Sequence, residues 1–424
     1  MALEIGTATD HADLYAKLRA FVVAGENASQ ILTLSANAGD TETVTIDSKV
    51  YTFQTTLTNT DGNVHIGATA LDSLNNLRQA INLEPAGSGT SYAAATVVHP
   101  TARAVNGAGN TLVARAKAPG TGGNSLATTE TLANGSWGDT TMNDGGTNAW
   151  TELAYNGTNS AIYNAPGLSG AEEIGIGLGF EANVGTDSYA LTGWMFRSYN
   201  AALPQTGQPG HSGLGYQAVW NQPTPYWFIG NGQRVIVVTK ISTVYTASYI
   251  GKFLMYGAPG EYPQPYVRLM TGQDNTRWSS TSPSFRCFFD PGNHGGTDML
   301  NPNGNWYQLT NFIDSGGNES PWDGSNFLWP YNAPLSVNLI NTNSFTCYRE
   351  LRDNIDDVSY TMWPLIVMGE LPSVDIYGEL DGAFACPGFD AATEDLIYQD
   401  NEFHLLVQNC FRTQRYHYGA IMLK

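Results

Sequence analysis

The segment Tyr226-Trp-Phe-Ile-Gly-Asn-Gly-Gln-Arg-Val-Ile-Val-Val-Thr-Lys240 is the clearest β-hairpin signal in the chain. Aromatic and β-branched residues form two runs, and the turn Gly230-Asn-Gly232 separates them. Two such runs around a glycine-rich turn are typical of antiparallel strands. The hairpin therefore predicts a mainly β fold for the region around it.

The chain on both sides of this hairpin, from Trp150 onward, has the same character. In the stretch Glu172–Phe180, glycines alternate with apolar residues from Ile174 on, so we expect a backbone or an aromatic ring to approach one face closely. Three prolines in Gly257–Tyr266 exclude a regular strand there. We expect mostly loops in residues 279–334, and an antiparallel β-sandwich or meander overall. Further strands are predicted at residues 172–180, 189–199, 245–256, 362–368, 377–385, 403–407 and 418–423.

Residues 27–147 differ from both flanks in composition. They are rich in Ala, Thr, Gly and Asn and contain one of the ten tryptophans, Trp137, whereas the other tryptophans and all four cysteines lie at or after Trp150. Such a shift indicates a module inserted at a loop. We predict a β-rich parent domain from residues 1–26 plus 148–424, with a further split near 270–340 as an alternative. The inserted α+β module is residues 27–147.

The inserted module is predicted to hold one helix over an antiparallel sheet, with the helix at Thr69–Ile81. A second helix should precede the module, capped by Asp10 and ended near Gly25, and pack on strands after Trp150. The module's two ends should lie within about 10–15 Å of each other, because close ends make insertions tolerable. Its strands are expected at residues 31–35, 42–46, 49–54, 95–98, 102–106, 111–117 and 125–132. Its core is expected to comprise Leu32, Leu34, Val44, Ile46, Tyr51, Phe53, Leu74, Ile81, Val105 and Val113.

The charge balance of the 424-residue chain argues against two classes of partner. Charged residues make up 13% of the chain and the net charge is −19, so the basic footprint of a nucleic-acid binder is missing. No secretory signal or long apolar segment is present, so we expect no membrane insertion. Few charges and many aromatics (11%) also suit a surface covered by partners or by copies of the chain itself. The cysteines have no metal-ligand spacing and are expected to be buried thiols.

We assign no catalytic, cofactor-binding or metal-binding residue from the sequence. The segments that we considered are each more simply explained as structural or solvated positions. They are Gly175-Ile-Gly-Leu-Gly179 as a nucleotide loop, Gly167-Leu-Ser-Gly170 as a nucleophile elbow, His294 with Asp298, the acidic group Asp353, Asp356 and Asp357, the pair Glu172 and Glu173, and the sequons at Asn134 and Asn156.

Two groups of aromatic residues could stack on sugars if they are exposed, although aromatics more often fill cores and interfaces. The groups are Trp220 with Tyr226 and Trp227, and Trp322 with Trp329 and Tyr331.

Several longer motifs resemble a family of virion structural proteins of tailed bacteriophages. The motifs are Trp220-Asn-Gln-Pro-Thr-Pro-Tyr-Trp-Phe228, Asn231-Gly-Gln-Arg-Val-Ile-Val-Val238, Val244-Tyr-Thr-Ala-Ser-Tyr-Ile-Gly251, Gly260-Glu-Tyr-Pro-Gln-Pro-Tyr266, Tyr377-Gly-Glu-Leu-Asp-Gly382, Phe411-Arg-Thr413 and the opening segment through Leu18. The family's usual Tyr-Pro-Tyr-Pro is altered here to Tyr-Pro-Gln-Pro-Tyr. The insert resembles a second phage module found within various virion proteins, through Gly39-Asp-Thr-Glu-Thr-Val-Thr-Ile-Asp-Ser-Lys-Val-Tyr-Thr-Phe53 and Gly123-Asn-Ser-Leu-Ala-Thr-Thr-Glu-Thr-Leu-Ala133.

This resemblance implies a non-enzymatic structural component of a tailed-phage virion, assembled in the host cytoplasm. The tail, tail tip or baseplate is the expected location, and the expected partners are copies of the chain itself and other virion proteins. One alternative is a host-surface adhesin that binds a glycan, and another is a capsid or collar decoration protein. A hydrolase that degrades host polysaccharide is the enzymatic alternative, and it would need two carboxylates at glycosidase spacing.

Overall fold

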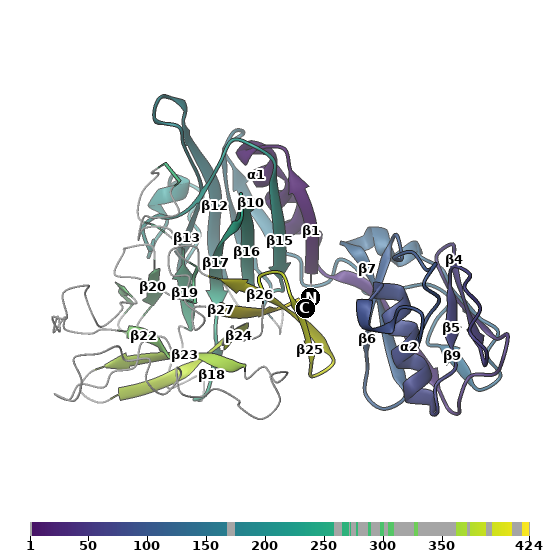
Figure 1. Cartoon of the computed structure of the whole chain (residues 1–424). Coiled ribbons are helices and arrows are strands. Elements are labelled where there is room, and N and C mark those ends of the chain that lie inside the picture. The colour runs from purple at the N-terminus through teal and green to yellow at the C-terminus, as the bar shows by residue number, and fades with distance from the viewer. Residues whose placement is uncertain are drawn as a thin grey trace. The chain divides into compact units, whose positions relative to one another are not determined.

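The structure is a computed structural model of the chain (Figure 1). It describes residues 2–167, 174–257, 265–270, 272, 277–278, 287–289, 297–300, 304–308, 326–329, 362–370, 374–386, 392–408 and 418–423. The chain forms two compact units. Unit 1 comprises Met1–Glu4, Ala24–Thr147 and Tyr398–Phe403, and unit 2 comprises Ile5–Val23, Asn148–Ile397 and His404–Lys424. Unit 1 therefore contains the predicted insert together with two short segments from elsewhere in the sequence.

Unit 1 consists of two four-stranded sheets and one helix. The sheets have the orders β6-β7-β2-β9 and β5-β4-β3-β8. All these pairs are antiparallel except β4 with β5, which is parallel. The prediction of a single antiparallel sheet was therefore wrong. The elements are β2 (Asn27–Leu34), β3 (Thr43–Ile46), β4 (Lys49–Gln54), β5 (Asn63–His65), α2 (Ala70–Asn82), β6 (Ala102–Asn106), β7 (Thr111–Pro119), β8 (Thr128–Glu130) and β9 (Gly135–Trp137).

The helix α2 begins at a capping box. The Thr69 hydroxyl accepts a hydrogen bond from the Asp72 backbone N–H, and the Asp72 carboxylate accepts one from the Thr69 backbone N–H. These two bonds satisfy amides that have no partner inside the helix. Leu83 ends the helix in the left-handed conformation, with φ of 56°. The predicted strand at residues 95–98 is not formed, and the predicted strand at 125–132 shortens to β8.

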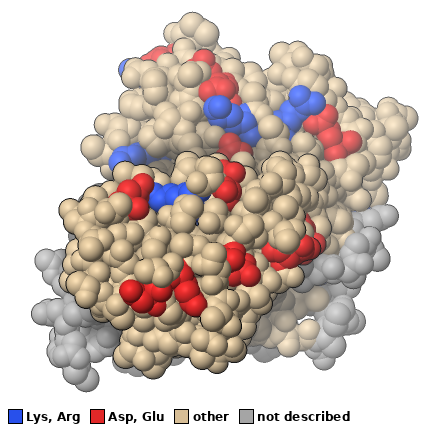
Figure 2. Space-filling view, turned by 90° about the vertical axis from the view of Figure 1, so that its right-hand side faces the viewer, with Lys and Arg blue, Asp and Glu red and all other residues tan. Residues whose placement is uncertain are grey.

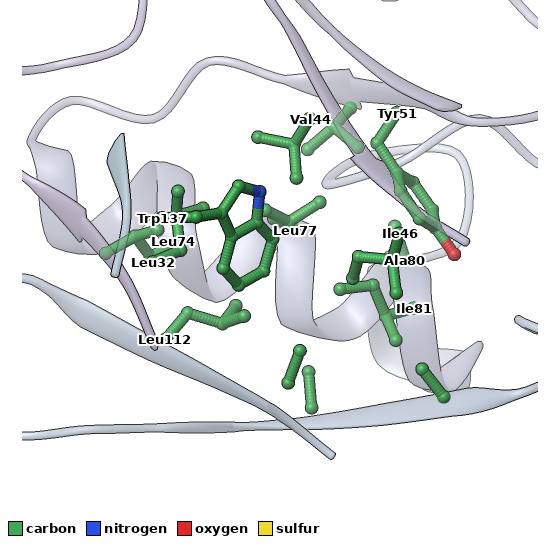
Figure 3. Packing of buried hydrophobic residues seen from close by; sticks show 14 of the residues in the cluster. Leu32, Val44, Ile46, Tyr51, Leu74, Leu77, Ala80, Ile81, Leu112 and Trp137 are labelled. Carbon is green, nitrogen blue, oxygen red and sulfur yellow. The ribbon is translucent and has the colours of Figure 1, made fainter. Parts of the chain in front are cut away.

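The core of unit 1 lies between α2 and the two sheets. Figure 3 shows the Trp137 indole beside Leu74 and Leu77 of α2, with Leu32 and Leu112 nearby. Eight residues of the predicted core belong to this cluster, namely Leu32, Leu34, Val44, Ile46, Tyr51, Phe53, Leu74 and Ile81.

Val105 and Val113 are not members of this cluster, although Val105 is 2% exposed and therefore buried. They are paired across β6 and β7, and Val113 also pairs with the exposed Ile31 on β2. Their neighbours in sequence, Ala104 and Leu112, are in the core cluster. Because side chains alternate along a strand, the two valines face away from the core.

The outer edge of β6 is closed by side chains instead of another strand. The Asn82 amide both donates to the Ala104 carbonyl, at 2.8 Å, and accepts from the Ala104 N–H, at 2.9 Å. It thereby reproduces the pairing that a neighbouring strand would offer. The His99 Nδ1 accepts from the Ala102 N–H, and the Tyr398 hydroxyl accepts from the Asn106 N–H. Satisfied edge amides do not template the addition of a foreign strand.

His99 is fully buried in unit 1, and its hydrogen bonds fix its protonation state. Nε2 lies 3.0 Å from the Ile46 carbonyl, while Nδ1 accepts from the backbone N–H groups of Thr101 and Ala102. Nε2 therefore carries the proton, and Nδ1 has no room for a second one. Burial, together with the positive charges of Lys117 and Lys49, lowers the pKa of His99.

The entry and exit of the inserted segment are joined by backbone hydrogen bonds. The Glu26 N–H donates to the Thr147 carbonyl at 2.9 Å, and the Gly146 N–H donates to the Glu26 carbonyl at 2.8 Å. Gly25, which precedes Glu26, has φ of 76°. A Cβ at this position would lie 2.6 Å from the Gly146 backbone. The ends of the insert thus lie side by side, which is the geometry that an insertion at a loop requires.

Unit 2 begins with β1 (Ala2–Ala8, shared with unit 1) and α1 (His11–Ala24). The Asp10 carboxylate caps α1 by accepting from the Asp13 N–H at 2.8 Å, as predicted. The helix contacts strands that follow Trp150. Its Phe21 ring lies 5.6 Å from Phe228, and its Arg19 pairs with Glu152.

Two antiparallel sheets of unit 2 form a β-sandwich. A five-stranded sheet has the order β10-β11-β12-β13-β14, and a seven-stranded sheet has the order β1-β15-β16-β17-β19-β20-β21. The mainly β fold predicted from the sequence is confirmed, and β15 and β16 form the predicted hairpin. The strands are β10 (Thr151–Tyr155), β11 (Ser160–Ala165), β12 (Ile174–Asn183), β13 (Ser188–Phe196), β14 (Gly215–Val219), β15 (Thr224–Gly230), β16 (Arg234–Ile241), β17 (Val244–Lys252), β19 (Tyr266–Leu269), β20 (Thr297–Leu300) and β21 (Trp306–Gln308).

A polar group crosses the interior of this sandwich. The Gln217 side chain on β14 is fully buried and its amide nitrogen lies 3.1 Å from the hydroxyls of both Thr239 on β16 and Thr246 on β17. The two hydroxyls are also hydrogen-bonded to each other at 2.8 Å. A buried polar group is tolerated only with partners, so this bond fixes β14 against the facing sheet.

A third sheet of unit 2 has the order β22-β23-β24-β27-β26-β25, with β18 paired to β24. Arg234 on β16 is fully buried, and its Nε lies 3.2 Å from the Asp381 carboxylate on β24. The Asn231 amide donates to the same carboxylate at 2.8 Å. This ion pair connects the sandwich to the third sheet. Its strands are β18 (Leu254–Met255), β22 (Asn326–Trp329), β23 (Trp363–Glu370), β24 (Val374–Cys386), β25 (Leu396–Gln399), β26 (Glu402–Gln408) and β27 (Tyr418–Met422).

The glycines of β12 seat aromatic rings, as the sequence predicted. Gly177 pairs with Trp194 and Gly175 pairs with Phe196 across β12 and β13. A Cβ on Gly177 would lie 1.8 Å from the Trp194 indole, and one on Gly175 would lie 2.3 Å from the Phe196 ring. Both rings therefore lie flat over the strand because their neighbours lack side chains.

We predict that Gly177→Ala destabilises unit 2 by about 1–3 kcal/mol, the usual cost of overpacking a core. Gly185→Ala serves as the control, because a Cβ there meets only the Asn183 side chain at 3.4 Å. Chemical denaturation of the two variants measures the difference. Equal stabilities would show that the Trp194 ring can move aside.

We also predict that unit 1 loses stability as the pH falls below about 6.5, the pKa of an unperturbed histidine. Because the pKa of folded His99 is lowered, His99 takes up its proton at a higher pH in the unfolded chain than in the folded one. The stabilisation is thus complete above pH 6.5 and lost progressively below it. Hydrogen exchange of β6 and β7 between pH 8 and pH 5.5 measures this loss. His99→Gln should remove the dependence, whereas the control His65→Gln should retain it.

Candidate functional site

Several positions considered in the sequence lie outside the described residues. The structure therefore does not test the acidic pair, the acidic group, the metal-like histidine or the second aromatic group. These positions are Glu172, Glu173, His294, Asp353, Asp356, Asp357, Trp322 and Tyr331, together with the side chains of Asp298 and Trp329 and the thiols of Cys347 and Cys410. The nucleophile-elbow segment is described only at Gly167.

The first aromatic group is not an exposed platform. Tyr226 is 3% exposed and Trp227 is 9% exposed, and Trp220 is only partly exposed. The Tyr226 ring stacks on Phe228 at 4.1 Å, inside unit 2. These residues fill the sandwich, which is the common use of aromatics in β proteins.

The Asn156 side chain is hydrogen-bonded within its own turn. Its side-chain oxygen accepts from the backbone N–H groups of Thr158, Asn159 and Ser160, at 2.9, 2.9 and 3.1 Å. Its amide nitrogen donates to the Asn159 side chain. The Asn-Gly-Thr sequence thus builds a hairpin turn between β10 and β11.

Among the described residues, no group of three or more His, Cys, Asp or Glu side chains is placed to hold a metal ion. Cys287 and Cys386 are buried free thiols, as expected for these two positions. Burial raises the pKa of Cys386 to about 12. Neither described helix is long and apolar enough to span a membrane.

A charged and largely buried site lies in unit 1, where three arginines lie around a short hairpin tip. We call Arg78, Arg103 and Arg115 the arginine cluster, and Tyr398–Phe403 the tip. Arg103 on β6 and Arg115 on β7 are paired across the strands, on the face that points away from the α2 core. Two like charges directly opposite one another destabilise a sheet, so this pair needs a carboxylate.

Glu402 of the tip supplies that carboxylate. Its two oxygens accept from the two terminal nitrogens of Arg115, both at 2.7 Å. The Arg115 and Glu402 side chains are 13% and 9% exposed, so the pair is largely removed from water. Burial and the nearby Arg115 lower the pKa of Arg103, which Glu402 opposes. A bidentate arginine–carboxylate pair of this kind fixes both distance and orientation.

The aromatic residues of the tip add a second anchor. The Arg78 guanidinium lies 3.9 Å from the centre of the Tyr398 ring, while its Nη1 pairs with Glu84 at 2.8 Å. The Tyr398 ring in turn lies 4.8 Å from the Phe403 ring. Asp400 and Asn401 both have positive φ, which is the signature of a tight two-residue hairpin turn. The tip is therefore a compact structure that the arginine cluster recognises by charge and by shape.

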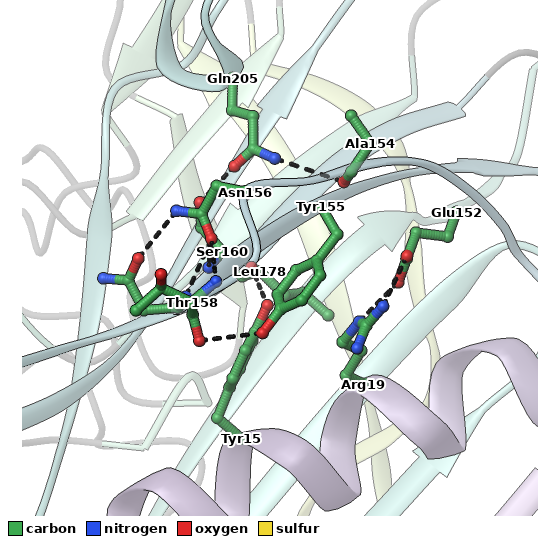
Figure 4. A network of polar contacts seen from close by, with 11 residues as sticks. Tyr15, Arg19, Glu152, Ala154, Tyr155, Asn156, Thr158, Ser160, Leu178 and Gln205 are labelled. Atoms are coloured by element: carbon green, nitrogen blue, oxygen red, sulfur yellow. Dashed lines mark hydrogen bonds and ion pairs between the residues drawn. The ribbon is translucent and has the colours of Figure 1, made fainter.

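A second, more exposed polar site lies in unit 2 (Figure 4). Arg19 on α1 makes a bidentate ion pair with Glu152 on β10, with both distances 2.7 Å. The same guanidinium lies 3.7 Å from the centre of the Tyr155 ring, which is 37% exposed. Gln205 donates to the Ala154 carbonyl at 3.3 Å and contacts the Ser160 hydroxyl. An exposed ring beside amides and hydroxyls is chemically suited to a polar, uncharged ligand such as a sugar.

The surface charge agrees with the excess of acidic over basic residues in the sequence. Figure 2 shows one face of the molecule, on which basic side chains lie next to acidic ones and further acidic patches have no basic neighbour. In residues 24–147, Lys49 pairs with Asp61 and Arg78 pairs with Glu84. The acidic patches without a basic neighbour agree with the net charge of −19.

No protein-family model matches the chain, and no curated protein matches it in sequence. The arginine cluster was missed by sequence reasoning. Its only sequence signal is the outward position of Arg103 and Arg115 on alternating strands in a chain that has few basic residues. The partner, Glu402, lies 287 positions beyond Arg115, so no local pattern connects them.

We predict that Glu402→Gln destabilises unit 1 by about 3 kcal/mol, the lower end of the cost of breaking a buried ion pair. Arg115 would then lose the charged partner of its bidentate ion pair. Glu130→Gln on β8 is the control, because it changes the same charge outside the arginine cluster. Thermal unfolding and hydrogen exchange of β6 and β7 measure the effect. Equal protection in both variants would contradict the assigned role of Glu402.

Proposed function

We propose that this protein is a non-enzymatic structural component of a tailed-phage virion, located in the tail, tail tip or baseplate and assembled as a symmetric homo-oligomer. The motifs that resemble virion proteins are the starting point. Their use in the structure supports the proposal, because residues 234–238 and 245–251 of two of these motifs are buried in unit 2.

The observation that carries the proposal is the contact among Asn231, Arg234 and Asp381. These residues come from two separate motifs, and they meet in one buried hydrogen-bonded group. Arg234 is fully buried in this group, and the Asp381 side chain is 13% exposed. Residues that hold sheets together suit a scaffold, whereas catalytic groups must reach a substrate.

The joined ends of the insert add independent support. A module entered and left through hydrogen-bonded neighbours, Glu26 and Thr147, can be added to a scaffold without breaking its sheets. The insert resembles a module found within various virion proteins, which fits a structural protein with an added domain.

We predict that a density map of the intact particle contains this chain in symmetric rings or arrays. Each copy should bury well over about 1,000 Å² against its neighbours, the threshold for a specific interface. Low charge and many aromatics favour such contacts. Isolated copies that barely touch their neighbours, or absence of the chain from the particle, would refute the proposal.

We further expect the purified protein to release no oligosaccharide from host surface polysaccharide. The assay should include a phage depolymerase as a positive control. Release that a single Asp or Glu substitution abolishes would establish an enzyme instead.

A host-surface adhesin is the second candidate, and the exposed Tyr155 ring beside Arg19 and the polar β10–β11 turn favours it. Here Tyr155→Ala should abolish binding to immobilised host polysaccharide, while Tyr199→Ala, which removes another exposed ring, should leave it unchanged. Absence of binding by the wild-type chain would remove this candidate.

A further inference from the structure

The tip is assigned to a different unit from the residues that flank it. Tyr398–Phe403 belongs to unit 1, whereas Ile397 and His404 on either side belong to unit 2. Both strands of the hairpin, β25 and β26, therefore pass from one unit to the other within a single residue. A short segment that is attached to one unit and packs in another is the kind of element that protomers exchange in domain swapping.

We propose that the arginine cluster is a docking surface for the tip of a second copy of this chain, so that subunits are joined by exchange of residues 398–403. The proposal rests on the homo-oligomeric assembly proposed above and names the contact that makes it. Each cluster would bind one tip, and each chain would give its tip to a neighbour.

Charge complementarity supports this occupant. The cluster brings Arg78, Arg103 and Arg115 together in a chain of net charge −19, so it is a basic site in an acidic molecule. Glu402 and the Tyr398 ring match it in charge and in cation–π geometry. Two acidic copies repel each other, and a matched basic site offsets that repulsion where they meet.

The contacts that hold the tip come from six consecutive residues. Its tight turn, its paired rings and its Glu402 all lie within Tyr398–Phe403. The same bonds therefore form whether the tip comes from the same chain or from a neighbour. Exchange of the tips requires no interaction that the single chain does not already make. Such exchange is therefore a low-cost route to an oligomer.

The test uses two full-length charge-reversal variants with different affinity tags. One carries Arg115→Glu and keeps its native tip, and the other carries Glu402→Arg and keeps its native cluster. Within either chain alone, the cluster and the tip have like charges. In a mixed pair with exchanged tips, one site regains Arg115 with Glu402 and the other gains the reversed pair.

If tips are exchanged, refolding or co-expressing the two variants together should give mixed oligomers, seen by native mass spectrometry after sequential purification on both tags. Each variant alone should show at least a tenfold loss of oligomer. The double variant R115E/E402R should regain wild-type assembly, because its pair is matched again in either arrangement.

Mixed oligomers at no more than the random proportion, with each variant alone assembling like the wild type, would overturn the exchange. A double variant that stays unassembled would overturn it too, because charge pairing would then not hold the tip. If the reversals prevent folding, Arg115→Gln and Glu402→Gln are mixed instead, and exchanged tips then restore one Arg115–Glu402 pair while the other site holds two glutamines.

Failure of the tip exchange and failure of the proposed structural role give different results. A wild-type chain that assembles, with variants that never complement each other, refutes the exchange and leaves the structural role intact. A wild-type chain that stays monomeric at all concentrations and in the particle refutes both.

Discussion

The buried pairing of Arg234 with Asp381 is the interaction on which the arrangement of unit 2 depends. It connects β16 of the sandwich to β24 of the third sheet, at a position where Arg234 has no access to water. Removing one partner would leave a charge in the interior, which costs far more than the pair itself contributes. The turn at Asn231 serves the same group, because its side chain binds Asp381 and also accepts from the Gln233 and Arg234 N–H groups. A hairpin turn and a distant strand are therefore held by one carboxylate.

Unit 1 uses the same chemistry with a different geometry. Its α2 core is apolar and closes without charged groups, as Figure 3 shows. On the opposite face of β6 and β7, two arginines need Glu402, and the tip that carries it comes from the far end of the chain. In both units, a basic residue on a strand is neutralised by an acidic residue far away in sequence. These two buried ion pairs help to specify which distant segments of the chain meet.

The sequence predicted well where a pattern was local. The hairpin of β15 and β16, the helix α2 and the seating of Trp194 against Gly177 each follow from neighbouring residues or from strand periodicity. The predictions failed where a choice between two faces was needed. Val105 and Val113 lie outside the α2 cluster, whereas their strand neighbours Ala104 and Leu112 belong to it. Short strands such as β5 and β9 were missed because three residues carry too little periodicity to be recognised.

The amino-acid sequence by itself determined the mainly β character, the compositional boundary of the insert and the strong acidity, because these depend on residue types and their local spacing. Tertiary structure alone decided that the insert contains two sheets, that Tyr226 and Trp227 are interior, and that Glu402 belongs with Arg115. The physical reason is that burial and ion pairing depend on which segments meet across hundreds of residues. A sheet brings such segments together through backbone hydrogen bonds, which are the same for every sequence, so the identity of the partners is settled only when the side chains of the whole chain are packed together.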